Sequence, residues 1–361
     1  MSVTSSQSRF LINLSSVRAN YLAFSDAIHQ YQRNDIIAYS VKANYDSKIM
    51  QALASLGSYM EVCSEFEYSQ AIEYVKSPRN IIINGFHVEP DLLLQHIKLG
   101  SLVILNSIDE LKYLTEINIP VRIGIRLNLD YIKNGELYFS HFSRFGISPY
   151  APELLKILTN SNIQIICLHC HFSGNSRSPE IYYNIVQELC RIISSHRMKD
   201  VQMIDIGGGY KVGPTFWTFD DYVNKVNMAL YKAHQEHLRV IYEPGNSIVR
   251  NTCSYHTFVI AIAQHNGIRD IVISGTKYHC GQGRRNLENF IRFANSPIRP
   301  LCHEVQRITG CTCKESDILC ELTHFPYLEI GDELIIDELG AYTMNEIPQF
   351  LLPAPNRDYL P

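Results

Sequence analysis

The sequence predicts an α/β fold in which a (β/α)8 TIM-like barrel is followed by a C-terminal antiparallel β domain. The chain has 361 residues, enough for one large barrel with an addition. Up to residue 246, short and almost continuously apolar runs alternate with amphipathic stretches, as expected for parallel strands that are covered by helices. After residue 246, strand-like runs follow one another with few helical intervals, which is typical of an antiparallel sheet.

The barrel is predicted over residues 17–246, because eight strand-like runs fall in this region and take about 210 residues, the usual size of the fold. Helical patterns such as SKIMQALASLG and APELLKILTN lie between them. The eight runs are IIAYSVKA (36–43), SYMEVCS (58–64), NIIINGF (80–86), LVILNS (102–107), VRIGIRLN (121–128), IQIICLHCHF (163–172), VQMIDIGGG (201–209) and RVIYEPGN (239–246).

The β domain is predicted from residues 247–361 together with residues 1–16. Its candidate strands are SYHTFVIAIAQHN, IRDIVISGT, HEVQRITG and DELIIDEL. The N-terminal segment RFLINLS precedes the barrel and alternates weakly, so we expect it to add a strand to this domain.

The composition excludes several classes of protein. A net charge of −4 gives no basic field for nucleic acid or membrane surfaces, and no apolar run approaches the roughly 20 residues of a membrane helix. The N-terminus lacks the apolar core of a secretory signal, and ten scattered cysteines favour free thiols in a reducing cytoplasm. Cys311 and Cys313 form a C-x-C pair without a second pair nearby, so no metal site is expected.

The barrel prediction gathers several polar residues in one place. Active sites of this fold lie at the carboxyl ends of the strands, where we expect Lys42, the end of LHCHF, the glycines of DIGGG and Glu243. Lys42 allows two interpretations. Its stem can lie on apolar surface while its ammonium reaches water, or its amine can form an imine with a carbonyl cofactor.

Ordered motifs along nearly the whole chain resemble the ornithine/diaminopimelate decarboxylases, pyridoxal-phosphate enzymes built on an alanine-racemase-like barrel (fold type III). The motifs are YSVKAN, VCSEFE, SRFG, HCHFSG, DIGGGY, YEPGN, CTCKESDIL and LEIGDELIIDELGAYT. Each motif alone is weak, and their order at predicted strand ends makes the resemblance specific.

The resemblance implies roles for three residues around the cofactor ring. Lys42 matches the lysine that binds pyridoxal 5'-phosphate covalently, and Glu243 matches the carboxylate that bonds the pyridine nitrogen and keeps the ring protonated. His171 matches the histidine that stacks on the ring, whereas His169 is interpreted as a core histidine. Without the resemblance, Glu243 could be a helix cap.

The resemblance also implies a phosphate site. Gly207, Gly208 and Gly209 offer backbone N–H groups with no side chains in the way, although three glycines alone could form a tight turn. Tyr342 matches a tyrosine of the β domain that bonds the same phosphate, with packing on a sheet as the alternative.

Two departures from the family concern this cofactor site. The family usually has Gly-Ser after the stacking histidine, whereas here Ser173 precedes the glycine. Asn246 replaces the arginine that usually follows EPG, which removes a cation near the phosphate.

Cys313 matches a cysteine that the partner subunit contributes in this family to protonate the carbanion, which implies a homodimer with shared active sites. A thiol is suited to this role because its pKa can be tuned towards neutrality. Arg126 matches a cofactor-binding position. Further matched positions in the wall of the site are Glu61, Ser64 and Glu67.

The substrate is where the sequence departs most from the family. Diamine-producing members carry an acid after the catalytic cysteine to hold a distal ammonium, and here that residue is Lys314. A second position that is acidic in these family members is occupied here by Ser274. Ornithine, lysine and diaminopimelate are therefore poor candidates, since like charges repel. Arg284 and Arg285 either face the same region or form a solvated surface.

The sequence therefore predicts a decarboxylase for a modified amino acid with an anionic distal group. Such substrates occur in the biosynthesis of siderophores and of peptide-nucleotide antibiotics. The alternatives are an amino-acid racemase of the same barrel and a catalytically inactive regulatory homologue. The CTCKESD segment argues against a racemase, and Lys42 with the intact glycine segment argues against an inactive homologue.

Overall fold

The computed structural model describes residues 7–86, 89–117, 119–129, 132–133, 136–137, 143–158, 162–172, 174, 176–281, 286–295, 297–348 and 350–361. The chain forms two compact units. The barrel unit is Arg18–Ser247, and the β unit combines Met1–Val17 with Ile248–Pro361.

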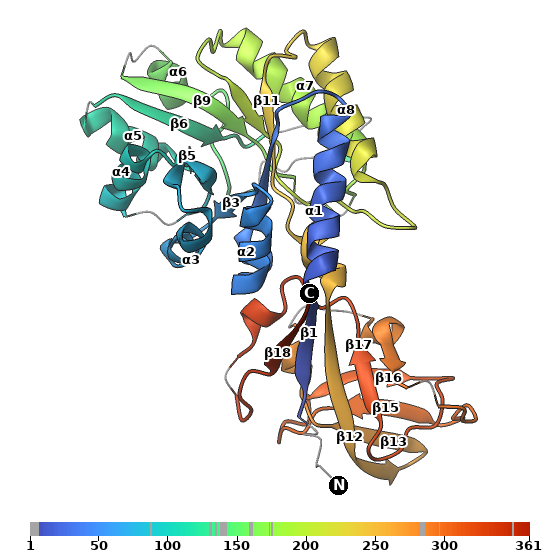
Figure 1. Cartoon of the computed structure of the whole chain (residues 1–361). Helices are drawn as coiled ribbons and strands as arrows, with labels where there is room; N and C mark the ends of the chain where they lie inside the picture. Colours follow the sequence, from blue (N-terminus) through green and yellow to red (C-terminus); the bar gives the residue numbers. More distant parts are fainter. Residues whose placement is uncertain are drawn as a thin grey trace. The chain divides into compact units, whose positions relative to one another are not determined.

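The barrel unit is a closed barrel of eight parallel strands, shown in Figure 1. Each of the eight predicted apolar runs contains one of them, so this part of the predicted fold is confirmed. The strands are β2 (Ile36–Ser40), β3 (Tyr59–Val62), β4 (Ile81–Ile83), β5 (Leu102–Leu105), β6 (Val121–Arg126), β9 (Ile163–His169), β10 (Met203–Asp205) and β11 (Arg239–Tyr242).

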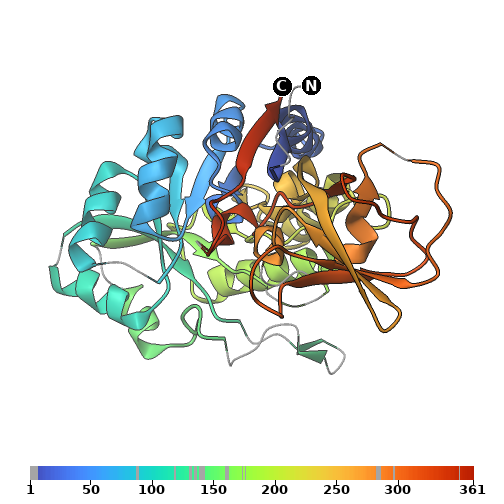
Figure 2. The ribbon, with the colours of Figure 1, turned by 90° about the horizontal axis from the view of Figure 1, so that it is seen from below.

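Helices connect successive strands and lie outside the barrel (Figure 2). A short hairpin of β7 (Ile132–Lys133) and β8 (Glu136–Leu137) follows β6. None of the helices in the described ranges is long and apolar enough to cross a membrane. The helices are α1 (Leu14–His29), α2 (Ser47–Ser55), α3 (Glu65–Val75), α4 (Pro90–Leu99), α5 (Ile108–Ile117), α6 (Pro152–Ile157), α7 (Pro179–Ser195), α8 (Phe219–Lys232) and α9 (Asn246–Val249).

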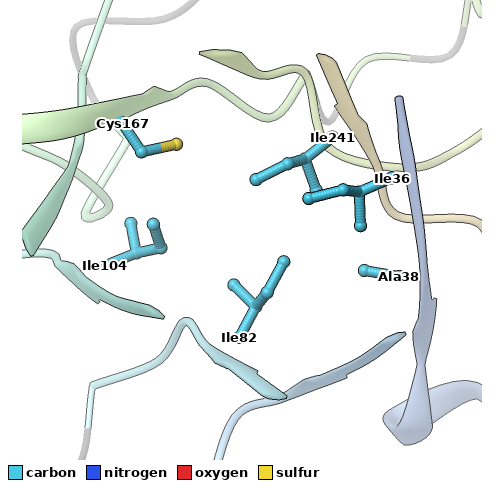
Figure 3. Packing of buried hydrophobic residues seen from close by; sticks show 6 residues of the cluster. All are labelled: Ile36, Ala38, Ile82, Ile104, Cys167 and Ile241. Atoms are coloured by element: carbon cyan, nitrogen blue, oxygen red, sulfur yellow. The ribbon is translucent and has the colours of Figure 1, made fainter. Parts of the chain in front are cut away.

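Apolar side chains fill the interior of the barrel. Figure 3 shows six of them pointing toward one another from five different strands: Ile36, Ala38, Ile82, Ile104, Cys167 and Ile241. Gly124 on β6 makes room for this packing, because a Cβ there would lie 2.3 Å from Cδ1 of Ile104. The barrel is therefore a packed core rather than a channel, and polar side chains belong to its carboxyl-terminal mouth.

The β unit is one sheet in the order β14-β17-β12-β13-β15-β16, with β1 pairing β12 and β18. The prediction that the RFLINLS segment adds a strand is confirmed, since β1 pairs antiparallel with β12. The sheet is mixed rather than purely antiparallel, because β13 runs parallel to β15 and β1 runs parallel to β18. Its strands are β1 (Arg9–Asn13), β12 (Cys253–His265), β13 (Ile268–Ile273), β14 (Ile291–Phe293), β15 (Val305–Thr309), β16 (Ile318–Leu322), β17 (Glu333–Ile336) and β18 (Asn356–Leu360).

Candidate active site

Lys42 lies just beyond the carboxyl end of β2. The chain makes one 3₁₀ turn there, Val41–Ala43, in which the residues on both sides of Lys42 are buried. Nζ of Lys42 donates to the carboxylate of Glu61 and to Sγ of Cys63, the latter at 3.4 Å. Burial lowers the pKa of Lys42, but the charge of Glu61 helps to outweigh burial and leaves that pKa well above its usual value.

Hydrogen bonds of Ser40 hold the Lys42 turn against the YEPGN segment. The amide and the hydroxyl of Ser40 donate to the carbonyls of Pro244 and Glu243, at 3.1 Å in both cases. Gly245 allows this close approach, because a Cβ there would lie 2.9 Å from the Cβ of Ala43. The local sequence therefore fixes the lysine and the glutamate in the same part of the barrel mouth.

Glu243 belongs to a buried polar cluster with His169, Asp205 and Asn84. Nε2 of His169 lies 3.5 Å from Oε2 of Glu243 and 3.9 Å from Oδ1 of Asp205. The side-chain amide of Asn84 lies 3.1 Å from Nε2 of His169 and donates to Oε1 of Glu243 at 3.4 Å. All four side chains are buried, so they hold Glu243 in one orientation away from water.

The pKa values of the two carboxyl groups of this cluster are shifted in opposite directions. Burial raises the pKa of Asp205, and the charge of Glu243 raises it further. Burial also acts to raise the pKa of Glu243, but interaction with His169 and the charge of Lys42 outweigh it and lower that pKa. Glu243 is therefore a buried anion that can accept a hydrogen bond from a protonated ring nitrogen.

The glycine loop, residues 207–209, lies against His171. The amide of Gly208 donates to Nδ1 of His171 at 3.2 Å. Gly207 has a φ of 68°, and a Cβ there would lie 2.5 Å from the same nitrogen. Burial lowers the pKa of His171 to about 3, so the imidazole is neutral near neutral pH.

Buried tyrosines bind the carbonyl groups of the glycine loop. The hydroxyl of Tyr210 donates to the carbonyl of Gly207 at 2.6 Å, and the hydroxyl of Tyr182 donates to the carbonyl of Gly208 at 2.8 Å. These two hydrogen bonds fix the carbonyls of the loop within the barrel unit.

Ser64 and Glu67, expected in the wall of the site, cap helix α3. The hydroxyl of Ser64 accepts from the amide of Glu67 at 3.2 Å, and the carboxylate of Glu67 accepts from the amide of Cys63 at 2.6 Å. These contacts fix the turn between β3 and α3. Their effect on the site is indirect, since this turn holds Cys63 beside Lys42.

The remaining expected residues of the barrel unit have fewer contacts. Arg126 ends β6, and its guanidinium carbon lies 4.4 Å from the ring centroid of Phe145. Asn246 is exposed at the start of α9. Ser173 lies outside the described residues.

In the β unit, Cys313 and Lys314 are exposed in the loop between β15 and β16. Nζ of Lys314 lies 4.0 Å from the ring centroid of Phe350 and 5.0 Å from that of Tyr278. Asp317 closes the loop, because its buried carboxylate accepts from the side chains of neighbouring threonines and from the amide of Lys277.

Ser274 directs its hydroxyl into a polar cluster within the β sheet. It lies 3.0 Å from the hydroxyl of Ser8 and 3.3 Å from that of Thr257, and it accepts from the amide of Phe258. Tyr342 is 41% exposed with a φ of 52°. Arg284 and Arg285 lie outside the described residues.

Two residues of the Glu243 cluster were missed by sequence reasoning. Asn84 and Asp205 both stand at the end of an apolar strand, where a polar side chain reaches the mouth of a barrel. The same position was used to select Lys42 and Glu243, so this signal was available. His169, interpreted as a core histidine, is buried but also bonds the Glu243 cluster directly.

The chemistry of these side chains fits pyridoxal phosphate. Lys42 is paired with the buried carboxyl group of Glu61, Glu243 lies in a buried polar cluster with a lowered pKa, and a neutral imidazole lies next to a glycine loop. These groups would suit the carbonyl, the ring nitrogen and the phosphate of that cofactor.

Comparisons with known proteins identify the family of this chain. A family model described as "Pyridoxal-dependent decarboxylase, pyridoxal binding domain" matches residues 14–250. Diaminopimelate decarboxylase of Helicobacter pylori is 24% identical over 375 residues, which cover 94% of this chain and 87% of that protein. Ornithine decarboxylase of Schizosaccharomyces pombe is 23% identical over 337 residues, which cover 85% of this chain and 73% of that protein.

A solved structure is similar over almost the whole chain. The crystal structure of diaminopimelate decarboxylase from Helicobacter pylori complexed with L-lysine has a TM-score of 0.82 at 22% sequence identity, and the match covers 99% of this chain and 92% of that one. The fold and the site thus define a pyridoxal-phosphate enzyme of the carboxy-lyase class. The chain belongs to the pyridoxal-dependent decarboxylase family.

Proposed function

We propose that this enzyme decarboxylates an amino acid whose distal end carries a carboxylate or a phosphate ester. The observation that carries the proposal is Lys314, a cation in the residue directly after Cys313. In the resemblance described above, an acid at this position holds a distal ammonium. A cation there repels an ammonium and attracts an anion.

The cofactor is proposed to lie in the mouth of the barrel, held by Lys42 at its carbonyl and by Glu243 at its ring nitrogen. When bound, pyridoxal phosphate withdraws electrons from the substrate and so stabilises the charge left when carbon dioxide departs. Glu243 is suited to keep the ring nitrogen protonated because its own pKa is lowered. His171 is proposed to cover one face of the ring as a neutral imidazole.

The phosphate is proposed to bind the glycine loop. Among the three glycines, Gly207 and Gly208 already direct their amides to Asp205 and His171. Further proposed contacts to the cofactor come from Arg126, Ser173, Asn246 and Tyr342.

Cys313 is proposed to return a proton to the α-carbon after decarboxylation, from the partner subunit of a homodimer. Its exposure in the β unit is compatible with contact to a second chain. Lys42→Ala and Cys313→Ala are each expected to be nearly inactive, and mixing them with subunit exchange should restore activity, because a mixed dimer contains one intact site. No recovery despite demonstrated exchange would mean that one chain builds the whole site.

The ammonium of Lys314 lies near two aromatic rings. The rings of Phe350 and Tyr278 limit the positions of its ammonium without neutralising it, since a cation over an aromatic ring keeps its charge. Ser274 is a less suitable substrate contact, because its hydroxyl is used within the sheet. Arg284 and Arg285 are proposed to add positive charge near the same end of the substrate.

The biological setting is proposed to be a biosynthetic pathway for siderophores or for peptide-nucleotide antibiotics, in the cytoplasm. All ten cysteines are free, as expected for a protein that works in a reducing compartment.

The charge of the substrate is tested by comparing carbon dioxide release from 2-aminoadipate and from lysine, two amino acids of similar length with opposite distal charge. We expect the anionic substrate to be favoured about ten- to a hundredfold, the value of one charge-assisted contact. Lys314→Met should remove this preference, and Lys314→Asp should reduce activity on the anionic substrate further.

The matched control is Lys232→Met, which removes an exposed lysine that also lies over a tyrosine ring, that of Tyr183. It should leave the preference unchanged. Efficient turnover of lysine or ornithine by the natural protein would overturn the anionic-substrate proposal.

A further inference from the structure

Arg177 lies against the glycine loop, although the sequence analysis assigned it no role. A Cβ on Gly209 would lie 1.9 Å from Nη1 of Arg177 and 2.8 Å from its Cζ. Gly209 has a φ of 95°, a conformation that glycine adopts without strain. The absence of a side chain at position 209 thus makes room for the guanidinium.

The neighbours of this guanidinium are neutral. Nη1 of Arg177 donates to the carbonyl of Phe172 at 2.6 Å, and the guanidinium also interacts with the hydroxyl of Tyr182. Within the described ranges of the chain, no carboxylate lies close enough to Arg177 to form an ion pair. An arginine has five N–H donors, so most of them remain for an anion.

The backbone beside Arg177 offers a further donor. The amides of Gly207 and Gly208 are used by Asp205 and His171, whereas the amide of Gly209 has no acceptor in the part of the chain that the structure describes. A guanidinium and a backbone N–H next to each other match the oxygens of a phosphate group.

We propose that Arg177 supplies the cation that binds the cofactor's phosphate, in place of the arginine that Asn246 replaces. A phosphate ester carries close to two negative charges near neutral pH, and a neutral, exposed asparagine cannot balance them. Arg177 reaches the same loop from the segment between β9 and α7. The proposal rests on the proposed phosphate role of the glycine loop.

The test measures the affinity of the cofactor-free protein for pyridoxal phosphate and for pyridoxal, which lacks the phosphate. Arg177→Met keeps an unbranched side chain about as long as the apolar stem of arginine but removes the charged guanidinium group, which lies over the ring of Phe172. We expect it to weaken pyridoxal phosphate binding about ten- to a hundredfold and to leave pyridoxal binding unchanged. Arg177→Lys should retain most of the affinity for pyridoxal phosphate.

A rescue variant separates a charge effect from a purely structural one. Arg177→Met combined with Asn246→Arg restores a cation at the position where the resemblance implies one near the phosphate, so pyridoxal phosphate affinity should recover at least tenfold relative to Arg177→Met. A structural defect at position 177 would not be corrected by a change at position 246. Arg126→Met is the comparison variant. It should change the ratio of the affinities for pyridoxal phosphate and pyridoxal less than Arg177→Met does.

Three results would overturn the proposal: unchanged pyridoxal phosphate affinity in Arg177→Met, equal weakening for both ligands, or no rescue by Asn246→Arg. If Arg177→Met does not fold, the proposal is tested with Arg177→Lys and with the salt dependence of cofactor binding by the natural protein. Binding of pyridoxal phosphate should then weaken with salt more than binding of pyridoxal. Loss of covalent attachment at Lys42 in the natural protein would instead refute the proposed cofactor site, whatever Arg177 does.

Discussion

Replacing Lys42 by methionine in the cofactor-free protein leaves the carboxylate of Glu61 without its cation. The Glu61 side chain is fully buried, whereas that of Lys42 is 38% exposed. Removing one partner of a fully buried ion pair destabilises a protein by about 3–5 kcal/mol, because the other charge remains buried and unpaired. Since solvent already screens Lys42 in part, we expect Lys42→Met to lower the free energy of unfolding by about 2–3 kcal/mol at pH 8.

The deficit should depend on pH in a defined direction. Burial raises the pKa of Glu61, and losing Lys42 raises it further. A carboxyl group whose pKa is higher in the folded than in the unfolded protein binds more protons when folded, so the variant gains stability as the pH falls. The difference between Lys42→Met and the natural protein should therefore shrink between pH 8 and pH 6.

The assay is urea unfolding followed by fluorescence of Trp217, the single tryptophan, which lies in the barrel unit. The double variant Lys42→Met/Glu61→Gln should recover most of the lost stability and lose the pH dependence. Lys225→Met is the matched control, because Lys225 is 37% exposed but its partner Glu180 is 46% exposed, so we expect a cost below about 1 kcal/mol. Equal, pH-independent losses in the single and double variants would refute a buried charge at Glu61.

Three further predictions concern the barrel mouth. A Cβ at position 208 would lie 2.1 Å from the carbonyl oxygen of Glu243. Gly208→Ala should therefore destabilise the barrel by about 1–3 kcal/mol and weaken pyridoxal phosphate binding, which equilibrium dialysis measures. Unchanged binding would contradict this prediction. Burial lowers the pKa of His171 to about 3, so the unfolded protein binds a proton before the folded protein does as the pH falls. The free energy of unfolding should therefore decrease below pH 6.5, by about 1.4 kcal/mol at pH 5.5. His171→Gln should remove that part of the acid sensitivity in urea unfolding, and an unaltered pH profile would count against it. Glu243→Gln should slow carbon dioxide release from the best substrate about a hundredfold or more while the cofactor still binds, and near-natural rates would show that the buried anion is not needed.

The barrel could be predicted from the sequence because its strands are buried on both faces. Such strands appear as continuous apolar runs, and the residue that follows each run lies at the mouth. This logic brought Lys42, His171 and Glu243 into one unit before any contact was known. The mixed pairing of the β unit could not be predicted in the same way, because the period of a strand does not reveal the direction of its neighbour.

Some contacts of the site residues follow from local sequence patterns, and others depend on the folded chain. Ser64 and Glu67 have the Ser-x-x-Glu spacing of a helix start, and that local pattern accounts for their contacts. His169 was judged as a single residue, and its contact with Glu243 depends on a strand far away in the sequence. Arg177 gave no local signal, since only the folded chain brings it to Gly209.

The central claim is that Lys42 is the residue that carries pyridoxal phosphate, and reductive trapping tests it most directly. The purified enzyme should be yellow, and borohydride should change its absorption and fix the cofactor to the protein. Peptide mapping by mass spectrometry should then find the added mass on the peptide that contains Lys42, and Lys42→Met should carry none. Cofactor mass on any other lysine, or none on Lys42 in a fully loaded enzyme, would contradict the account.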